Sequence, residues 1–135
     1  MLEKLKTNFY NMITDLGFNI TDNRNFETGH SPWLMLRTNG YERVHSLDLQ
    51  MSKIVLVLDI FSHYNGEREI IRVIDTIADN LKNFITQNQE VLFCYQKNVK
   101  ILDDKMTGPV RKHGVVVYEF MMGTDNDEEG EKPNE

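Results

Sequence analysis

Five side chains capable of acid–base or nucleophilic chemistry stand close together in the sequence: Asp59, Ser62, His63, Glu67 and Glu69. A hydroxyl, an imidazole and a carboxylate are the parts of a nucleophile with its base. Ser62 and His63 are adjacent in the chain, however, and adjacent residues do not have the geometry of that pair. Glu67 and Glu69 open a predicted helix, whose positive end favours acidic side chains. We therefore expect this segment to be a corner of the scaffold and not an active site.

A metal site is not expected from the sequence. Asp59 and His63 could supply two ligands, but the local sequence contains no third. The single cysteine, Cys94, cannot support a zinc knuckle. No two of the four histidines share a ligand-like spacing; they are His30, His45, His63 and His113. We expect neither a metal nor any other cofactor.

The motifs that mark common catalytic sites are also missing. The chain has no G-x-S-x-G elbow and neither of the glycine-rich phosphate-binding patterns. Asn65 and Gly66 precede a helix and could present backbone N–H groups to an anion, but the two glutamates that follow would repel it. Cys94 lies in the apolar stretch VLFCYQ, where a cysteine usually acts as a small hydrophobic residue. The sequence predicts that the protein is not an enzyme.

Asp59 is the carboxylate with the most unusual surroundings, because it interrupts the apolar run at residues 54–61. Burial in such a run would raise its pKa. Hydrogen bonding between Asp59 and the following loop, residues 62–66, explains its position equally well. The sequence leaves both interpretations open.

Most of the negative charge belongs to one end of the chain. The formal net charge is −6, and residues 123–135 contribute −5 of it through six acidic residues and one lysine, which leaves −1 for the rest. Such a segment cannot bury enough apolar surface to order itself. We therefore expect one domain at residues 1–122 and a disordered acidic tail at residues 123–135. A segment that orders on a basic partner is the alternative. The nearly neutral domain argues against a broad nucleic-acid-binding face.

Length and composition predict a single small soluble domain. The 135 residues suffice for one domain with a real core. No apolar run approaches the roughly 20 residues that a membrane helix needs, so we expect no membrane partner. The N-terminal stretch lacks the pattern of a signal peptide. One cysteine allows no internal disulfide and favours an intracellular, reducing environment.

Apolar residues recur every three or four positions over residues 2–16 and 67–87, which predicts two amphipathic helices. Gly17 follows the first helix, as is typical of a helix C-terminus. We expect a loop at residues 21–30, which are polar. Asn39 and Gly40 carry the strongest signal for a tight hairpin turn. Strands are expected at residues 33–37, 41–46, 47–61, 91–102 and 115–122.

The predicted strand at residues 54–61, IVLVLDIF, is apolar on both faces. A strand with water on one side would alternate, so this one should be covered on both sides. Helices would cover one side; another subunit, or a second helix of the same chain, would cover the other. The predicted fold is α+β: a mixed, largely antiparallel sheet, with the N-terminal helix and a second long helix packed on it, most simply on one face.

The connection between the last two strands, residues 103–113, is longer than the two to five residues a hairpin usually needs. Long loops in compact domains often carry function. This one concentrates basic or titratable groups: Lys105, Arg111, Lys112 and His113. We predict that these four residues contact a neighbouring subunit or another assembly partner; a mobile, solvated loop is the alternative.

The order of these parts carries a resemblance to a known family. After the N-terminal helix come SPWLML at residues 31–36, the strand DLQMSKIVLVLDIF at 48–61, the loop YNG at 64–66 and the isoleucine-rich helix at 67–81. In order and spacing, this pattern resembles the small tail-completion proteins of long-tailed bacteriophages, which include tail terminators and tail-to-head joining proteins. It covers about the first two thirds of the chain. The last two strands fit the architecture without a signature of their own.

The resemblance implies a structural protein of phage morphogenesis. Copies of the chain would form a sixfold ring at the head-proximal end of the tail tube, end its growth and join the tail to the head. Its other partners would be the tail tube protein, the head-neck connector and the DNA that passes through the ring without sequence-specific binding. The four loop residues would contact a neighbouring subunit, the tube or the DNA.

The expected locations are the head–tail interface of the virion and, during assembly, the host cytoplasm. A head-closure or neck subunit and a small cellular oligomeric binding domain are the alternatives.

Overall fold

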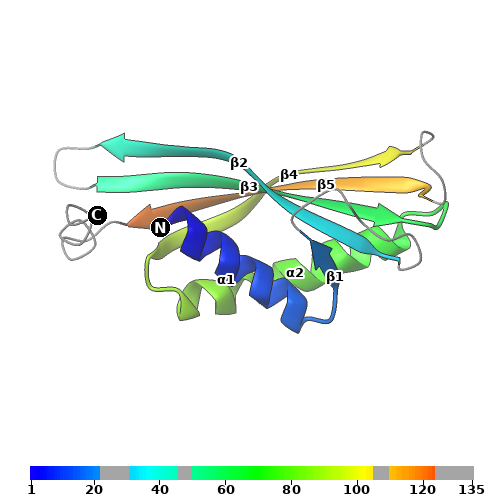
Figure 1. Ribbon diagram of the computed structural model, residues 1–135, viewed down its shortest axis with the longest axis horizontal. Helices are drawn as coiled ribbons and strands as arrows, with labels where there is room; N and C mark the ends of the chain where they lie inside the picture. Colours follow the sequence, from blue (N-terminus) through cyan, green and yellow to red (C-terminus); the bar gives the residue numbers. More distant parts are fainter. Residues whose placement is uncertain (22–30, 46–49, 105–109, 124–135) are drawn as a thin grey trace.

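The computed structural model describes residues 1–21, 31–45, 50–104 and 110–123. Lys105 and the predicted tail beyond Gly123 lie outside these residues, as does most of the loop predicted at residues 21–30. Two helices and five strands follow one another along the chain (Figure 1). Their bounds are α1 (Leu2–Asp15), β1 (Asn19–Thr21), β2 (Trp33–His45), β3 (Gln50–Ser62), α2 (Arg68–Gln87), β4 (Val91–Asp103) and β5 (Lys112–Gly123).

The strands form one five-stranded sheet in the order β1-β2-β3-β5-β4. Every neighbouring pair is antiparallel except β1 with β2, which is parallel. The α+β class and the largely antiparallel, mixed sheet predicted from the sequence are therefore confirmed, as is the antiparallel pairing of the last two strands. β3 and β5 are the central strands and pair over twelve residues each, from Met51 opposite Gly123 to Ser62 opposite Lys112.

Both helices lie on the same side of the sheet, as expected (Figure 1). The amphipathic pattern of each helix explains this, because its apolar stripe must be buried against the sheet. Phe9 of α1 occupies the middle of the core: its ring centroid lies 5.1 to 5.4 Å from those of Phe84, Tyr118 and Phe120, each ring edge-on. Aromatic rings prefer such edge-to-face contacts. One aromatic cluster thus joins both helices to β5.

The predicted turn at Asn39 and Gly40 is wrong. β2 runs without a break from Trp33 to His45, and the register with β3 shifts between Thr38 and Gly40. A glycine inside a strand often marks such a bulge. With a turn at Asn39 and Gly40, residues 33–38 and 40–45 would pair with each other. Instead both segments pair with β3, which provides far more ladder hydrogen bonds. The connection between β2 and β3 falls at residues 46–49, outside the described residues.

The sequence analysis also missed a strand. β1 is three residues long, exposed at its start, and pairs with β2 from Trp33 to Met35. So short a segment has no visible alternation. Gly17 ends α1 with a φ of +95°, the left-handed conformation that favours glycine. This confirms the predicted end of the first helix, and the chain then turns into β1.

The hairpin formed by β4 and β5 is longer than predicted. β4 continues to Asp103 and β5 begins at Lys112, so the connection is shorter at both ends. Lys112 and His113 were predicted in the loop but belong to β5. They pair with Asp103 and Leu102 of β4 on one side and with Ser62 and Phe61 of β3 on the other. Pairing on both sides favours the extended conformation for these polar residues.

Candidate functional site

The corner at residues 62–69 is held by hydrogen bonds around one carboxylate. Glu69, in the first turn of α2, accepts hydrogen bonds from the hydroxyls of Ser62 at 2.7 Å and Ser31 at 2.5 Å. The Ser31 hydroxyl also accepts the backbone N–H of His63. These contacts tie the segment just before β2, the end of β3 and the start of α2 together. The hydroxyl of Ser62 is therefore bonded to Glu69. His63 takes part only through its backbone N–H, which is bonded to Ser31.

The sheet face turned away from both helices is here called the outer face. Residues Ile54, Leu56, Leu58 and Ile60 of β3 belong to the core under the helices, so the alternate residues project to the other side. The pairing register extends this alternation to the neighbouring strands. The outer face comprises Trp33, Met35, Arg37, Gly40, Glu42 and Val44 of β2; Met51, Lys53, Val55, Val57, Asp59 and Phe61 of β3; His113, Val115, Val117, Glu119 and Met121 of β5; and Phe93, Tyr95, Asn98, Lys100 and Leu102 of β4.

Asp59 lies at the centre of a charge cluster on the outer face. Its side chain is only 3% exposed; Arg37 Nε lies 2.8 Å from Oδ2 and His113 Nε2 lies 2.9 Å from Oδ1. Both predictions for this residue are wrong. Burial does act to raise its pKa, but the hydrogen bonds from His113 and Arg37 and their charges outweigh burial and hold the pKa below the ordinary 3.8. Its partners are on β2 and β5, and not in the loop at residues 62–66.

His113 is positioned from two sides on the outer face. Its ring stacks on Phe61 of β3, with ring centroids 4.5 Å apart and planes inclined by 20°. Its Nε2 meets the Asp59 carboxylate, as described above. The cluster of Arg37, Asp59 and His113 thus joins the neighbouring strands β2, β3 and β5.

A second buried carboxylate lies further along the same face. Glu119 of β5 is 5% exposed and accepts a hydrogen bond from the Tyr95 hydroxyl. Lys97 Nζ lies 3.3 Å from Glu119 Oε2, and Lys53 Nζ lies 3.9 Å from the same oxygen. Both buried carboxylates of the outer face are therefore paired with cations, as buried charges must be.

The remainder of the outer face is largely apolar, and its exposure increases toward β4. Val57 at the centre is buried, whereas Phe93, Tyr95 and Leu102 on β4 are 47%, 42% and 49% exposed. Both helices cover the opposite face (Figure 1). Side chains on both faces of β3 are thus largely apolar, as the sequence indicated. Neither helix covers those that project from the outer face. The sequence predicts the strand of β4 but gives Phe93, Tyr95 and Leu102 no functional role, because exposure of these side chains depends on what packs against each face.

Of the four residues predicted as an interface, the three that the structure describes have different surroundings. Lys105 lies outside the described residues. Arg111 is exposed, and its backbone N–H and C=O bond with Ser62 and Asp104. Lys112 Nζ lies 2.5 Å from Asp103 Oδ1, and this hydrogen bond raises the pKa of Lys112. Of the three described residues, His113 is the one on the outer face. The proposed contact of these residues with a partner stays a prediction.

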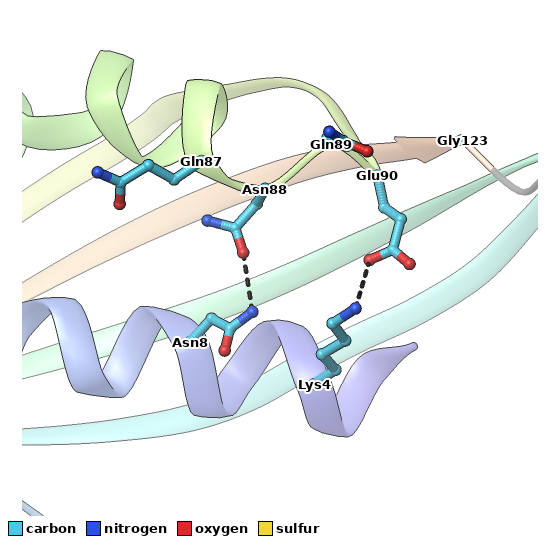
Figure 2. Close-up of a pocket in the computed structure, with 7 residues that line it drawn as sticks. All are labelled: Lys4, Asn8, Gln87, Asn88, Gln89, Glu90 and Gly123. Atoms are coloured by element: carbon cyan, nitrogen blue, oxygen red, sulfur yellow. Dashed lines mark hydrogen bonds and ion pairs between the residues drawn. The ribbon is translucent and has the colours of Figure 1, made fainter.

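A polar hollow of about 540 Å³ lies between the N-terminal half of α1 and the turn that joins α2 to β4 (Figure 2). Asn8 and Asn88 point toward each other and are joined by a hydrogen bond of 2.8 Å. Lys4 Nζ lies 3.6 Å from Glu90 Oε1. These interactions fasten α1 to the turn, and we assign the hollow to that packing.

Cys94 faces the core side of β4 and packs against the core cluster. Burial raises the pKa of its thiol to about 12. A nucleophilic cysteine needs a lowered pKa, so Cys94 is structural. Within the part of the chain that the structure describes, no three histidine, cysteine or acidic side chains gather as a metal site. None of the described helices is both long and apolar enough to cross a membrane.

Comparisons with known proteins leave the chain without an assigned family. No protein-family model matches the sequence. No curated protein matches it closely enough to count as a relative.

Proposed function

We propose that this protein is a structural subunit of phage tail completion. In this proposal, copies form a ring at the head-proximal end of the tail tube, end its growth and join the tail to the head. The protein acts by assembly and not by catalysis. Its partners are other copies of itself, the tail tube protein and the head-neck connector, and DNA passes through the ring. It is present in the host cytoplasm during assembly and at the head–tail interface of the virion.

The observation that carries the proposal is the outer face. Both helices pack on one side of the sheet, and the other side presents apolar side chains around two buried, cation-paired carboxylates. The exposed aromatic and aliphatic residues on β4 extend this face to the edge of the sheet. Contiguous apolar surface of this kind marks protein–protein contacts. The resemblance of residues 32–81 to tail-completion proteins gives the type of assembly.

Three cations of β2, β3 and β4 are paired within the chain, which is consistent with DNA that passes through and is not held. Arg37, Lys53 and Lys97 each lie within ion-pair distance of a carboxylate of the same chain. Cations that are already paired have less to gain from phosphate groups, and affinity for DNA rests mainly on phosphate contacts. The domain apart from residues 123–135 is also nearly neutral. Both features favour a ring that has weak affinity for the DNA passing through it.

A joining assay tests the proposal. Tails assembled without this protein are mixed with the purified protein and then with DNA-filled heads, and infectious particles are counted. Addition of the protein to the tails should restore joining. If the protein must be added to the heads instead, it is a head-closure or neck subunit. If folded protein binds neither tails nor heads, the phage role is wrong, and the small oligomeric binding domain is the better account.

A further inference from the structure

We propose that neighbouring copies join edge to edge: β4 of one copy pairs antiparallel with β2 of the next, with Lys100 opposite Glu42. The sheet then continues from copy to copy, with all helices on one side and all outer faces on the other. This inference rests on the proposed function in one respect, because it specifies how the subunits of the ring would contact each other.

The two edges of the sheet are the first observation. β4 is the last strand in the sheet order and pairs with β5 alone among the described strands. An edge strand presents unpaired backbone N–H and C=O groups that another strand can satisfy. β4 is thirteen residues long, and Val99 and Leu102 are 38% and 49% exposed on its two faces. Natural edge strands of this length are usually covered or strongly charged.

The other edge is available over part of β2. β1 pairs with β2 only from Trp33 to Met35. From Leu36 to His45, the described strands leave the same edge of β2 unpaired. Tyr41 in this segment is 43% exposed, and the Glu42 side chain is 64% exposed. A strand from another copy could therefore add beyond β1.

The strand directions at the two edges fit one another. Each step from β2 to β3, β5 and β4 is antiparallel, so β4 runs opposite to β2. If a second copy is placed beside the first in the same orientation, its β2 meets β4 antiparallel, and the sheet continues in its existing pattern. The contact joins two different surfaces, and such head-to-tail contacts generate rings when the rotation closes.

Charge and face select one register. Asn98, Lys100 and Leu102 project from the outer face of β4, and Gly40, Glu42 and Val44 project from the outer face of β2. Directly opposite residues in an antiparallel pair share a face. Placing Lys100 opposite Glu42 also places Ile101 opposite the exposed Tyr41. A shift of two residues either way keeps the faces but sets Lys100 opposite Val44 or Gly40 and loses the charge pair.

This register also avoids β1. With Lys100 opposite Glu42, the end of β4 at Asp103 lies opposite Asn39. β4 therefore stops before it reaches the residues of β2 that β1 already occupies, Trp33 to Met35. The bulge of β4 between Gln96 and Asn98 falls at the opposite end of the paired segment, opposite His45, the last residue of β2.

Charge reversal tests the pairing. Lys100→Glu and Glu42→Lys should each reduce assembly on tails on the order of tenfold or more, because like charges then face each other across the contact. The double variant restores the pair with reversed signs and should recover most of the assembly. Glu42 also lies 3.6 Å from Lys53 of its own chain, so recovery by the second change is the informative result. Lys82→Glu, on the exposed side of α2, is the matched control. Failure of the double variant to recover overturns the register.

Disulfide trapping tests the geometry. In a Cys94→Ser background, Glu42→Cys with Lys100→Cys should give a ladder of cross-linked oligomers on oxidation, in concentrated solution or on tails. Either change alone should give none, nor should Glu42→Cys with Lys82→Cys. A dimer from Lys100→Cys alone would mean that β4 pairs with β4 about a twofold axis, which overturns the proposal. Wild-type joining without a ladder refutes the edge contact and leaves the proposed function intact. A ladder from a protein that joins no tails supports the edge contact and refutes the phage role.

Discussion

His113 and Asp59 meet on adjacent central strands, with His113 Nε2 2.9 Å from Asp59 Oδ1, on the sheet face that the helices leave uncovered. Arg37 completes the cluster from β2, with Nε 2.8 Å from the other carboxylate oxygen. Asp59 is therefore a buried charge held by two partners on two strands. Removing a partner from such a charge costs more than the pair contributes. The cluster fixes the relative positions of three strands of the outer face.

The lowered pKa of Asp59 predicts how stability depends on pH. Because the folded pKa lies below the unfolded value near 4, ionised Asp59 stabilises the fold above that value, and this contribution is lost as the pH falls through the folded pKa. Asp59→Asn should lower the free energy of unfolding near neutral pH by about 2 kcal/mol, because charge-assisted hydrogen bonds are lost. The difference from wild type should shrink below pH 4. Urea titrations at several pH values measure it, with exposed Asp75→Asn as the control. A constant difference at all pH values would contradict this account.

At Gly114, Ile70 of α2 packs close against the backbone of β5. A Cβ at this position of β5 would lie 2.7 Å from Cγ2 of Ile70, in the buried core. Gly114→Ala should therefore destabilise the protein by about 1 to 3 kcal/mol, the usual cost of overpacking. Gly66→Ala is the control, because a Cβ at Gly66 meets nothing within 4 Å. Urea unfolding compares the two variants. Equal stabilities would show that α2 can move away from β5 without cost.

The Cys94 thiol should be unreactive in the folded protein. A pKa of about 12 leaves about a thousandfold less thiolate at neutral pH than the ordinary value of 9.0. Alkylation by iodoacetamide at pH 7.5 should be on the order of a hundredfold slower in the native protein than in urea, because thiolate is the nucleophile. Asn11→Cys in a Cys94→Ser background places a thiol on the exposed side of α1 and should react quickly in both states. Equal rates for native and unfolded Cys94 would contradict its assignment as structural.

Much of the fold was predictable because the strongest signals are local. The apolar periodicity of α1 and α2 specifies both helices and the face that each buries. Residues 54–61 are apolar on both faces, which correctly indicated a strand with helices on one side; that a second subunit covers the other side stays a prediction. Asn39 and Gly40 misled because an Asn-Gly pair signals a turn, and only the pairing partner, Val55 opposite Gly40, shows that the strand continues. A short stretch of sequence does not reveal which distant strand it pairs with.

The candidate site was less predictable, for the same reason. Arg37, Asp59 and His113 are far apart in the sequence, and the register of β2, β3 and β5 alone brings them together. His113 was assigned to a loop because its neighbours are polar. In β4, Val91, Phe93 and Tyr95 alternate as if they shared one face, but the register shift between Val91 and Phe93 leaves Val91 in the core and places Phe93 and Tyr95 on the outer face. The pairing order of the strands, and not any motif, creates the outer face.

The number of copies on each tail tests the central claim most directly. Purified tails completed with this protein can be analysed by quantitative mass spectrometry against the tube subunit, and labelled protein can be located by electron microscopy. The account predicts about six copies per tail, at the head-proximal end and independent of tube length, as a closed ring requires. A copy number that rises with tube length, or no bound protein on tails that still join heads, would contradict it.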